Sequence, residues 1–428
     1  FLFADLHPHL IGIPVAVLFC ATLLALLANA GRDWQRTAGL LALLSFLLGT
    51  LSSVNLWELP TYFALGTMAL AVAQYRQIGG AGVDSTRRRL FTVGAVAAYG
   101  GGAYLFYLPF FSHYVNVGAS GIGWVTTPDP PGRWLLIWGF FGFLAVTWVA
   151  YATIRRPWLC RSRGCSPTGL ERVISLAFRQ YDRLPRMVYL HQKIVRHPSV
   201  AYLMGMTLLG LAFALGVAAI ALGYVVLGLC LLPLTLAWLL LWRRGVDSDP
   251  AALFIALLIT MALAVLAGTQ IVYLRDFLQG GDWRRMNTLF KFFSQVWVLL
   301  GLATAIALPR MWGTVVRGQP GHRSSNIEAD LLPAPSKTQR TLGLVWASAF
   351  WILLAASLTF TVLGTPARLS QRMIGWRPEF GTLNGMDYMR QGSYTWPNDS
   401  NRIELVYDWE AIQWLLHNVR GNLVVVES

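Results

Sequence analysis

The sequence predicts an all-α polytopic membrane protein of about ten transmembrane helices, followed by the start of a small exterior α/β region. Of its 428 residues 55% are hydrophobic and 13% are charged, and the mean hydropathy is +0.51. Soluble domains carry about 25% charged residues, so this composition cannot supply a water-soluble surface. The net charge of +14 would suggest nucleic-acid binding in a soluble chain. In a membrane protein the positions of the charges matter more, and we expect no nucleic-acid partner.

Ten apolar stretches are long enough to cross a membrane, which takes about 20 residues of helix. They cover residues 10–30, 38–56, 59–75, 90–111, 134–154, 200–220, 222–242, 251–274, 288–308 and 342–363. The apolar run from 200 to 242 is too long for one crossing, so we interpret it as two helices joined by a tight turn at 221–223. Residues 1–363 therefore form a predicted transmembrane domain, and residues 364–428 form a predicted exterior region.

Lysine and arginine are concentrated in the loops on one side of these spans. Twenty-three of the 34 lie in one set of loops, and only Arg133, Arg275, Arg284 and Arg285 lie in the other set. Cytoplasmic loops carry the excess of these residues, so we expect a cell-membrane protein with both chain ends outside the cytoplasm. The long basic loop 155–198 is amphipathic in part and would contact anionic membrane lipids, or it is a solvated connector.

The first polar cluster on the predicted exterior side precedes the first span and contains Asp5, His7 and His9. Pro8 disfavours a helix at His7, and residues two apart in an extended chain face the same way. One carboxylate and two imidazoles are a candidate site for a divalent metal ion, and Asp5 is also a candidate general base. Alternatively, the histidines are interfacial polar groups or bond to a helix end.

The second cluster lies between the second and third spans, where Glu58 is the only charge in a short loop beside Asn55 and Trp57. A carboxylate here is a candidate catalytic group that contacts substrate or metal. It could equally interact with the dipole at the start of the third helix. Trp57 is a candidate substrate contact or an anchor at the membrane interface.

The third cluster, Asp276, Arg284, Arg285, Asn287 and Lys291, surrounds the start of the ninth span. Basic residues are disfavoured on this side, whereas helix N-termini and guanidinium groups both bind phosphate. Asn287 and Lys291 are one turn apart and share a face. The cluster predicts an anion site, most simply for a lipid phosphate or pyrophosphate. In the alternative interpretation acidic neighbours pair with the arginines and Lys291 extends toward the membrane surface.

The loop 112–133 between the fourth and fifth spans is long, rich in Gly and Pro, and nearly free of charge. It would cover a site or act as a passive connector. Sequence pattern alone does not choose between these two interpretations.

The predicted exterior region contains one clear helix, over residues 409–419. Asp408 is placed to cap its start and Gly421 to end it, and residues 423–426 are apolar and β-branched, as in a strand. This pattern predicts the beginning of an α/β module.

Five segments resemble the YYY-type polytopic membrane proteins, the Chlor_Arch_YYY domain family. They are Phe3–His9, Asn55–Tyr62, Tyr273–Asp276, Arg285–Phe292 and Tyr407–Leu415. The resemblance extends over nearly the whole chain and includes all three polar clusters. Family members carry Glu where this chain has Gln270, so the resemblance assigns no catalytic acid at that position.

The arrangement is also similar to the GT-C glycosyltransferases, which are membrane enzymes that use polyprenyl-phosphate sugars. This similarity implies a lipid-linked sugar donor as partner and no cofactor except, in some cases, a divalent metal ion. It implies that Asp5 is the acidic residue that activates the acceptor or holds the metal, and that Arg284, Arg285 and Lys291 bind the phosphate. It also implies at least one further span before Phe1.

Two other functions are compatible with the same residues. A transporter or binding protein for an anionic lipid or solute would use the basic cluster without chemistry. Transporters, however, have broken or polar segments at mid-membrane depth, and here the spans are mostly uninterrupted, with Gly100–Gly102 as the main exception. A structural subunit of a membrane assembly is favoured by the 18 Trp and 22 Phe. The sequence favours a one-sided membrane glycosyltransferase.

Overall fold

The computed structural model describes residues 8–29, 33–77, 85–115, 119–155, 200–242, 249–276, 281–316, 337–372, 386–395 and 401–421. The chain divides into a helical unit, His7–Phe350, and a second unit made of Phe1–Leu6 and Trp351–Ser428. A helix occupies each of the ten predicted spans, which confirms the all-α polytopic class. Among the described residues, seven helices are long and apolar enough to cross a membrane, and one more apolar helix is slightly shorter.

The long helices follow the predicted order. They are α1 (Pro8–Asn29), α2 (Trp34–Val54), α3 (Glu58–Gln77), α4 (Ser85–Phe106), α6 (Pro131–Arg155), α9 (Val200–Ala221), α10 (Val225–Leu241), α11 (Pro250–Gly268), α12 (Met286–Val315) and α14 (Lys337–Thr359).

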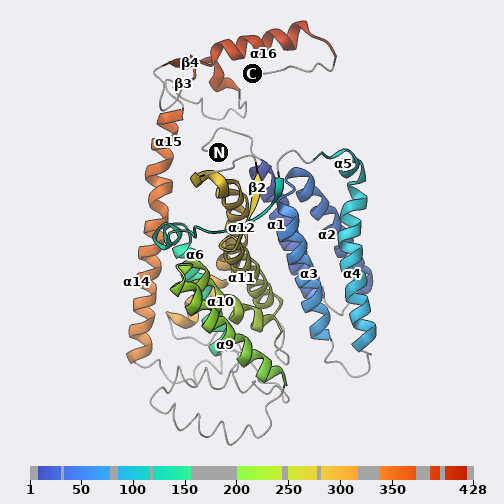
Figure 1. The fold of residues 1–428 in the computed structure, drawn as a ribbon, viewed down its shortest axis with the longest axis vertical. Helices are drawn as coiled ribbons and strands as arrows, with labels where there is room; N and C mark the ends of the chain where they lie inside the picture. Colours follow the sequence, from blue (N-terminus) through green and yellow to red (C-terminus); the bar gives the residue numbers. More distant parts are fainter. Residues whose placement is uncertain are drawn as a thin grey trace, which may run out of the picture. The chain divides into compact units, whose positions relative to one another are not determined.

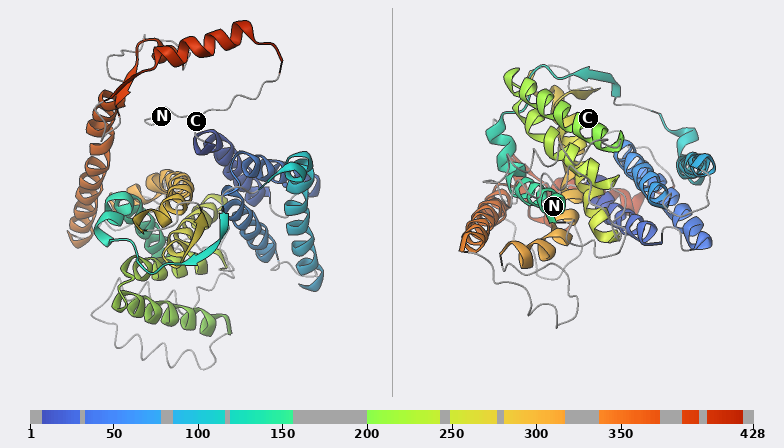
Figure 2. Two further views of the ribbon diagram at one scale, coloured as in Figure 1. Left: turned by 45° about the horizontal axis from the view of Figure 1, so that its top comes forward. Right: turned by 90° about the horizontal axis from the view of Figure 1, so that it is seen from below.

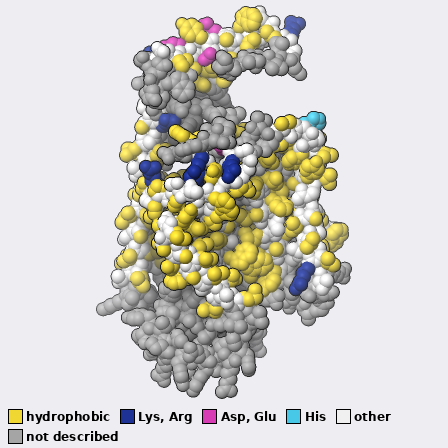
Figure 3. All heavy atoms as spheres, in the orientation of Figure 1, with side chains coloured by type: hydrophobic (Ala, Val, Ile, Leu, Met, Phe, Trp, Pro, Cys, Tyr) yellow, Lys and Arg dark blue, Asp and Glu magenta, His cyan; other side chains and the backbone are white. Residues whose placement is uncertain are grey.

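Within the helical unit these helices form two neighbouring groups (Figures 1 and 2). Helices α1 to α4 pack together in one group, and α6 with α9 to α12 form the other. Helix α11 also contacts α1 and α3, and nearly all of its residues are buried. It therefore lies at the centre of the unit. Apolar side chains cover most of the face of the bundle in Figure 3, as expected for a surface in contact with lipid.

Local sequence explains several helix ends. The Asp33 carboxylate accepts hydrogen bonds from the backbone N–H groups of Gln35 (2.9 Å) and Arg36 (3.3 Å) and so caps α2. Asp249 caps α11 in the same way, with Pro250 at the first helical position. Gly223, with φ of +87°, makes the turn between α9 and α10, which confirms the predicted tight turn.

Two predicted boundaries are wrong. Helix α11 ends at Gly268 instead of continuing to 274, and the strand β2 (Val272–Asp276) follows it. β2 pairs antiparallel with β1 (Ala119–Trp124), a strand that lies inside the predicted loop 112–133. β-Branched and aromatic residues in β2 favour a strand over a helix, and Gly121 has the positive φ that accompanies the irregular register of β1. The predicted span 90–111 is also broken, because α4 ends at Phe106 and a short helix, α5 (Leu108–His113), follows.

The second unit contains small elements after α14. They are η4 (Phe360–Gly364), α15 (Thr365–Arg372), η5 (Asp387–Arg390), β3 (Ser393–Thr395), β4 (Arg402–Glu404) and α16 (Val406–Asn418). The predicted helix 409–419 is confirmed as α16, but its cap is Leu405, and Asp408 lies in the first turn instead. A carboxylate there is still favoured by the helix dipole. The predicted strand 423–426 lies outside the described residues.

Close packing of α9 against α10 depends on two glycines. A Cβ on Gly228 would lie 2.6 Å from the backbone oxygen of Gly216 and 2.6 Å from Ile220 Cγ1, so any side chain there requires the helices to separate. Small residues commonly permit such close approach between membrane helices.

We therefore expect Gly228→Val to lower the thermal unfolding temperature of the protein in detergent. The matched control is Gly210→Val in α9, where an added Cβ meets no atom within 4 Å. Equal losses in the two variants would show that the α9–α10 contact is not tightly packed.

Candidate functional site

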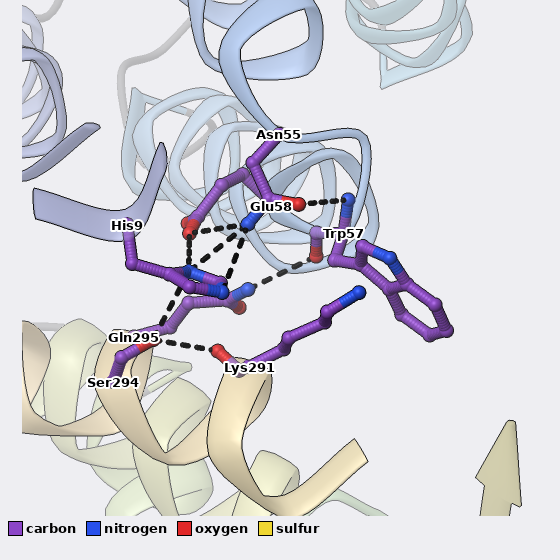
Figure 4. Close-up of polar contacts among 7 residues, drawn as sticks. All are labelled: His9, Asn55, Trp57, Glu58, Lys291, Ser294 and Gln295. Carbon is purple, nitrogen blue, oxygen red and sulfur yellow. Dashed lines mark hydrogen bonds and ion pairs between the residues drawn. The ribbon is translucent and has the colours of Figure 1, made fainter. Parts of the chain in front are cut away.

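Helix ends from three parts of the chain bring a set of polar residues together at one end of the helical unit. Figure 4 shows these side chains, which we call the His9 cluster: His9, Asn55, Trp57, Glu58, Lys291, Ser294 and Gln295. They come from the start of α1, the turn between α2 and α3, and the first turns of α12. Residues from all three predicted polar clusters thus meet in one place.

A buried imidazole and a buried carboxylate form the centre of the cluster. His9 Nδ1 lies 3.4 Å from Glu58 Oε1, and the two residues are only 8% and 6% exposed. Glu58 is the first residue of α3, and its backbone N–H donates to the Asn55 carbonyl (2.9 Å). Glu58 therefore lies at the start of α3, where the helix dipole favours a negative charge, which is one of the two alternatives predicted for it.

Asn55 orients the imidazole. Its Oδ1 accepts from the Trp57 backbone N–H (3.3 Å), which directs its Nδ2 toward His9 Nδ1 at 3.0 Å. An amide nitrogen is a donor, so His9 Nδ1 acts as the acceptor in this contact. A proton taken up at His9 Nδ1 would replace this contact and be donated to Glu58 Oε1, which lies 3.4 Å away. Such a pair can take up or release a proton during a reaction.

Lys291 lies beside this pair and above an aromatic ring. Its Nζ is 4.3 Å from the centroid of the Trp57 ring, a cation–π contact. The Trp57 backbone carbonyl accepts from Gln295 Nε2 (3.0 Å), which ties the chain at Trp57 to α12. In the described part of the chain no ion pair joins Lys291 to a carboxylate. Its ammonium group therefore keeps hydrogen-bonding capacity for an anion.

Asp276 and Asn287 lie next to Lys291. Asn287 Nδ2 donates to Asp276 Oδ2 at 2.8 Å, which joins the end of β2 to the first turn of α12. Asp276 also interacts electrostatically with Lys291. This pair places the strand end beside the predicted anion site.

Arg285 has a structural environment that its sequence position did not indicate. Its two Nη groups donate to the carbonyls of Thr127 (2.8 Å) and Thr269 (2.6 Å), and Nη1 lies 3.1 Å from Asp129 Oδ1. The residue is 7% exposed. Both Nη groups are thus used to hold the end of α11, the chain after β1 and the start of α12 together. Its predicted role in binding phosphate directly is not favoured by these contacts.

Arg284, its neighbour, has a more open position. Its Nη2 donates to the hydroxyls of Thr126 (2.7 Å) and Thr127 (3.4 Å), and both threonines are exposed. These threonines, and also Asp129, Gln270, Ser294 and Gln295, were not predicted as site residues. Their contacts join positions far apart in sequence, so no local pattern indicates them.

Asp5 and His7, the other predicted metal ligands, lie outside the described residues. Within the ranges that the structure describes, no group of three or more His, Cys, Asp and Glu could hold a metal ion. His9 and Glu58 are chemically suitable donors for a divalent cation, but a third protein ligand would have to come from outside those ranges.

A family described as uncharacterized membrane proteins, DUF2298, matches residues 1–300. The chain belongs to this family. The match covers all of the helix ends that form the His9 cluster, and together with the apolar helices it identifies an integral membrane protein. No curated protein and no solved structure matches this DUF2298 chain. The match supports neither the resemblance to the YYY-type family nor the similarity to the GT-C enzymes.

The two adjacent arginines should respond differently to the same substitution. Lysine cannot reproduce the three contacts of the Arg285 guanidinium, so Arg285→Lys should lower the free energy of unfolding by on the order of 3 kcal/mol. Arg284→Lys should change it little, because Arg284 bonds only to exposed hydroxyls and its contact with the Tyr273 ring, 5.9 Å from the centroid, is one that a lysine ammonium can also make. Thermal unfolding in detergent measures both variants, and equal stability losses would contradict the structural role of Arg285.

Proposed function

We propose that the chain is a membrane glycosyltransferase that uses a polyprenyl-phosphate-linked sugar on the extracytoplasmic face. The observation that carries this proposal is the Glu58–His9 pair beside the Lys291 ammonium group. Transfer of a sugar from a phosphate requires a group that accepts a proton and a group that stabilises negative charge. The His9 cluster offers both within one set of helix ends.

In the proposed reaction the acceptor hydroxyl attacks the anomeric carbon of the sugar. Its proton passes to the Glu58–His9 pair as the new carbon–oxygen bond forms. The bond between the anomeric carbon and the phosphate oxygen breaks, and its electron pair stays on the departing lipid phosphate. Lys291 and Arg284 stabilise this negative charge.

The remaining residues of the site support these two groups. Asn55 orients His9, and Trp57 supports Lys291 and offers an aromatic face to the sugar. Asn287 and Asp276 shape the wall on the β2 side, and Arg285 positions the surrounding chain.

Asp5 and His7 remain candidate site residues in this proposal because they precede His9 by four and two residues. Asp5 is the alternative proton acceptor. A divalent metal ion, where bound, would be held by His9 and Glu58 with Asp5 or His7, and it would offset negative charge on the phosphate.

A binding or transport protein for an anionic lipid is the second candidate function. It is favoured by the same free hydrogen-bonding capacity of Lys291, which would hold a phosphate whether or not Glu58 accepts a proton. Such a protein would bind lipid phosphate but would transfer no sugar.

Replacing the Glu58 carboxylate should reduce sugar transfer without preventing lipid phosphate binding. Glu58→Gln should reduce sugar transfer by about 10²-fold or more, because it removes the proton acceptor, while farnesyl phosphate still binds. The measurement is transfer of tritium-labelled hexose from a panel of polyprenyl-phosphate sugars to membrane acceptors. Glu404→Gln, in β4 of the second unit, is the matched control. Full transfer in both Glu58→Gln and Asp5→Asn would exclude the proposed proton transfer.

Replacing the lysine should affect binding instead. Lys291→Met should weaken farnesyl phosphate binding by about tenfold, the effect of losing one hydrogen bond to a charged group. Lys291→Arg should retain part of the affinity. Calorimetry in nanodiscs without anionic lipid measures the dissociation constants, with Arg340→Met in α14 as the control. Unchanged affinity in Lys291→Met would remove Lys291 from the site.

A further inference from the structure

The chain from Val125 to Pro130, between β1 and α6, is held in place by contacts with distant segments. Val125 N–H donates to the Ile271 carbonyl (2.9 Å), and the Val125 carbonyl accepts from the Tyr224 hydroxyl (2.7 Å). The Thr127 carbonyl accepts from Arg285. This irregular segment is therefore bound to the β2 side, to the start of α10 and to the start of α12.

We propose that this segment is a preformed part of the substrate site, in which the Thr126 and Thr127 hydroxyls and Arg284 bind an oxyanion of the substrate headgroup. The inference rests on the proposed function and extends it, because neither threonine has been assigned a role. It replaces the two interpretations of loop 112–133 as a cover or a passive connector.

The sequence of the segment favours a single backbone conformation. Pro128 and Pro130 have fixed φ angles, and each restricts the residue before it, Thr127 and Asp129. A segment with few accessible conformations loses little entropy when it binds a ligand. Preformed binding is thus favoured by the residues themselves.

Asp129 and Gln270 fix the position of the segment. Gln270 Nε2 donates to Asp129 Oδ2 (2.6 Å), and the Gln270 Oε1 accepts from the Asp129 backbone N–H (3.1 Å). Gln270 is completely buried, and the other Asp129 oxygen pairs with Arg285. Each polar group of the Gln270 amide therefore contacts Asp129, so the two residues act as positioning residues for the threonines.

The hydroxyls remain able to bind an anion. Each hydroxyl oxygen accepts a hydrogen bond from Arg284 Nη2, which leaves its own O–H proton free to donate. Two exposed O–H donors and a half-buried guanidinium beside them match the acceptor oxygens of a phosphate group. The shared chemistry is a phosphate oxyanion, either free or carried by a lipid.

The test compares farnesyl phosphate and inorganic phosphate as ligands of the full chain in nanodiscs without anionic lipid. The double variant Thr126→Val with Thr127→Val should weaken farnesyl phosphate binding by about tenfold, without lowering the unfolding temperature, because both side chains are exposed. Thr235→Val in α10, whose hydroxyl bonds only within its own helix, is the matched control.

A second set of variants tests the positioning role. Gln270→Met should weaken binding by a similar factor, and the triple variant with both threonine substitutions should be no weaker than the threonine double variant. Additive losses in the triple variant would show that Gln270 acts on the fold in general and would overturn its positioning role.

The remaining outcomes separate this inference from the proposed function. Normal binding in the threonine variant, with binding lost in Lys291→Met, would overturn the threonine subsite and leave the proposed function standing. No binding of either ligand by the unmodified chain would overturn both. Inorganic phosphate binding that depends on the threonines would support a subsite for free phosphate, and an effect limited to farnesyl phosphate would support one for a lipid headgroup.

Discussion

The structure of the candidate site depends on one constraint: polar and charged groups buried in an apolar bundle must find partners within the protein. His9 and Glu58 satisfy this constraint by contacting each other and Asn55, although they come from different helices. An unpaired charge in such surroundings is costly. The pairing therefore fixes how the starts of α1 and α3 lie relative to each other, and α12 is added through Ser294 and Gln295.

Much of the helical unit could be predicted from the sequence because apolar length is a strong signal for spans. The turn at Gly223 and the helix now called α16 were also predictable, since glycine and local periodicity mark them. The strand β2 was not, because its apolar residues follow the hydrophobic run of α11 after only two polar residues, Thr269 and Gln270. Only pairing with β1, about 150 positions earlier in the chain, distinguishes a strand there from the last turn of a helix.

The candidate site shows the same limit more sharply. The polar clusters could be found because charges are rare on one side of the spans, but the roles of Arg284 and Arg285 could not be separated. The two residues are identical in type and adjacent in sequence. Burial of Arg285 beside Asp129 and partial exposure of Arg284 beside Thr126 follow from contacts over more than 150 positions. Such contacts leave no local pattern in a single sequence.

Helix direction adds a further reason why anion chemistry suits this place. Helices α1, α3 and α12 all begin here, so the positive ends of three helix dipoles lie near the His9 cluster. The same field that stabilises the Glu58 carboxylate would stabilise an incoming phosphate. A carboxylate base and a phosphate site can therefore be neighbours here, because the helix dipoles and Lys291 both stabilise negative charge.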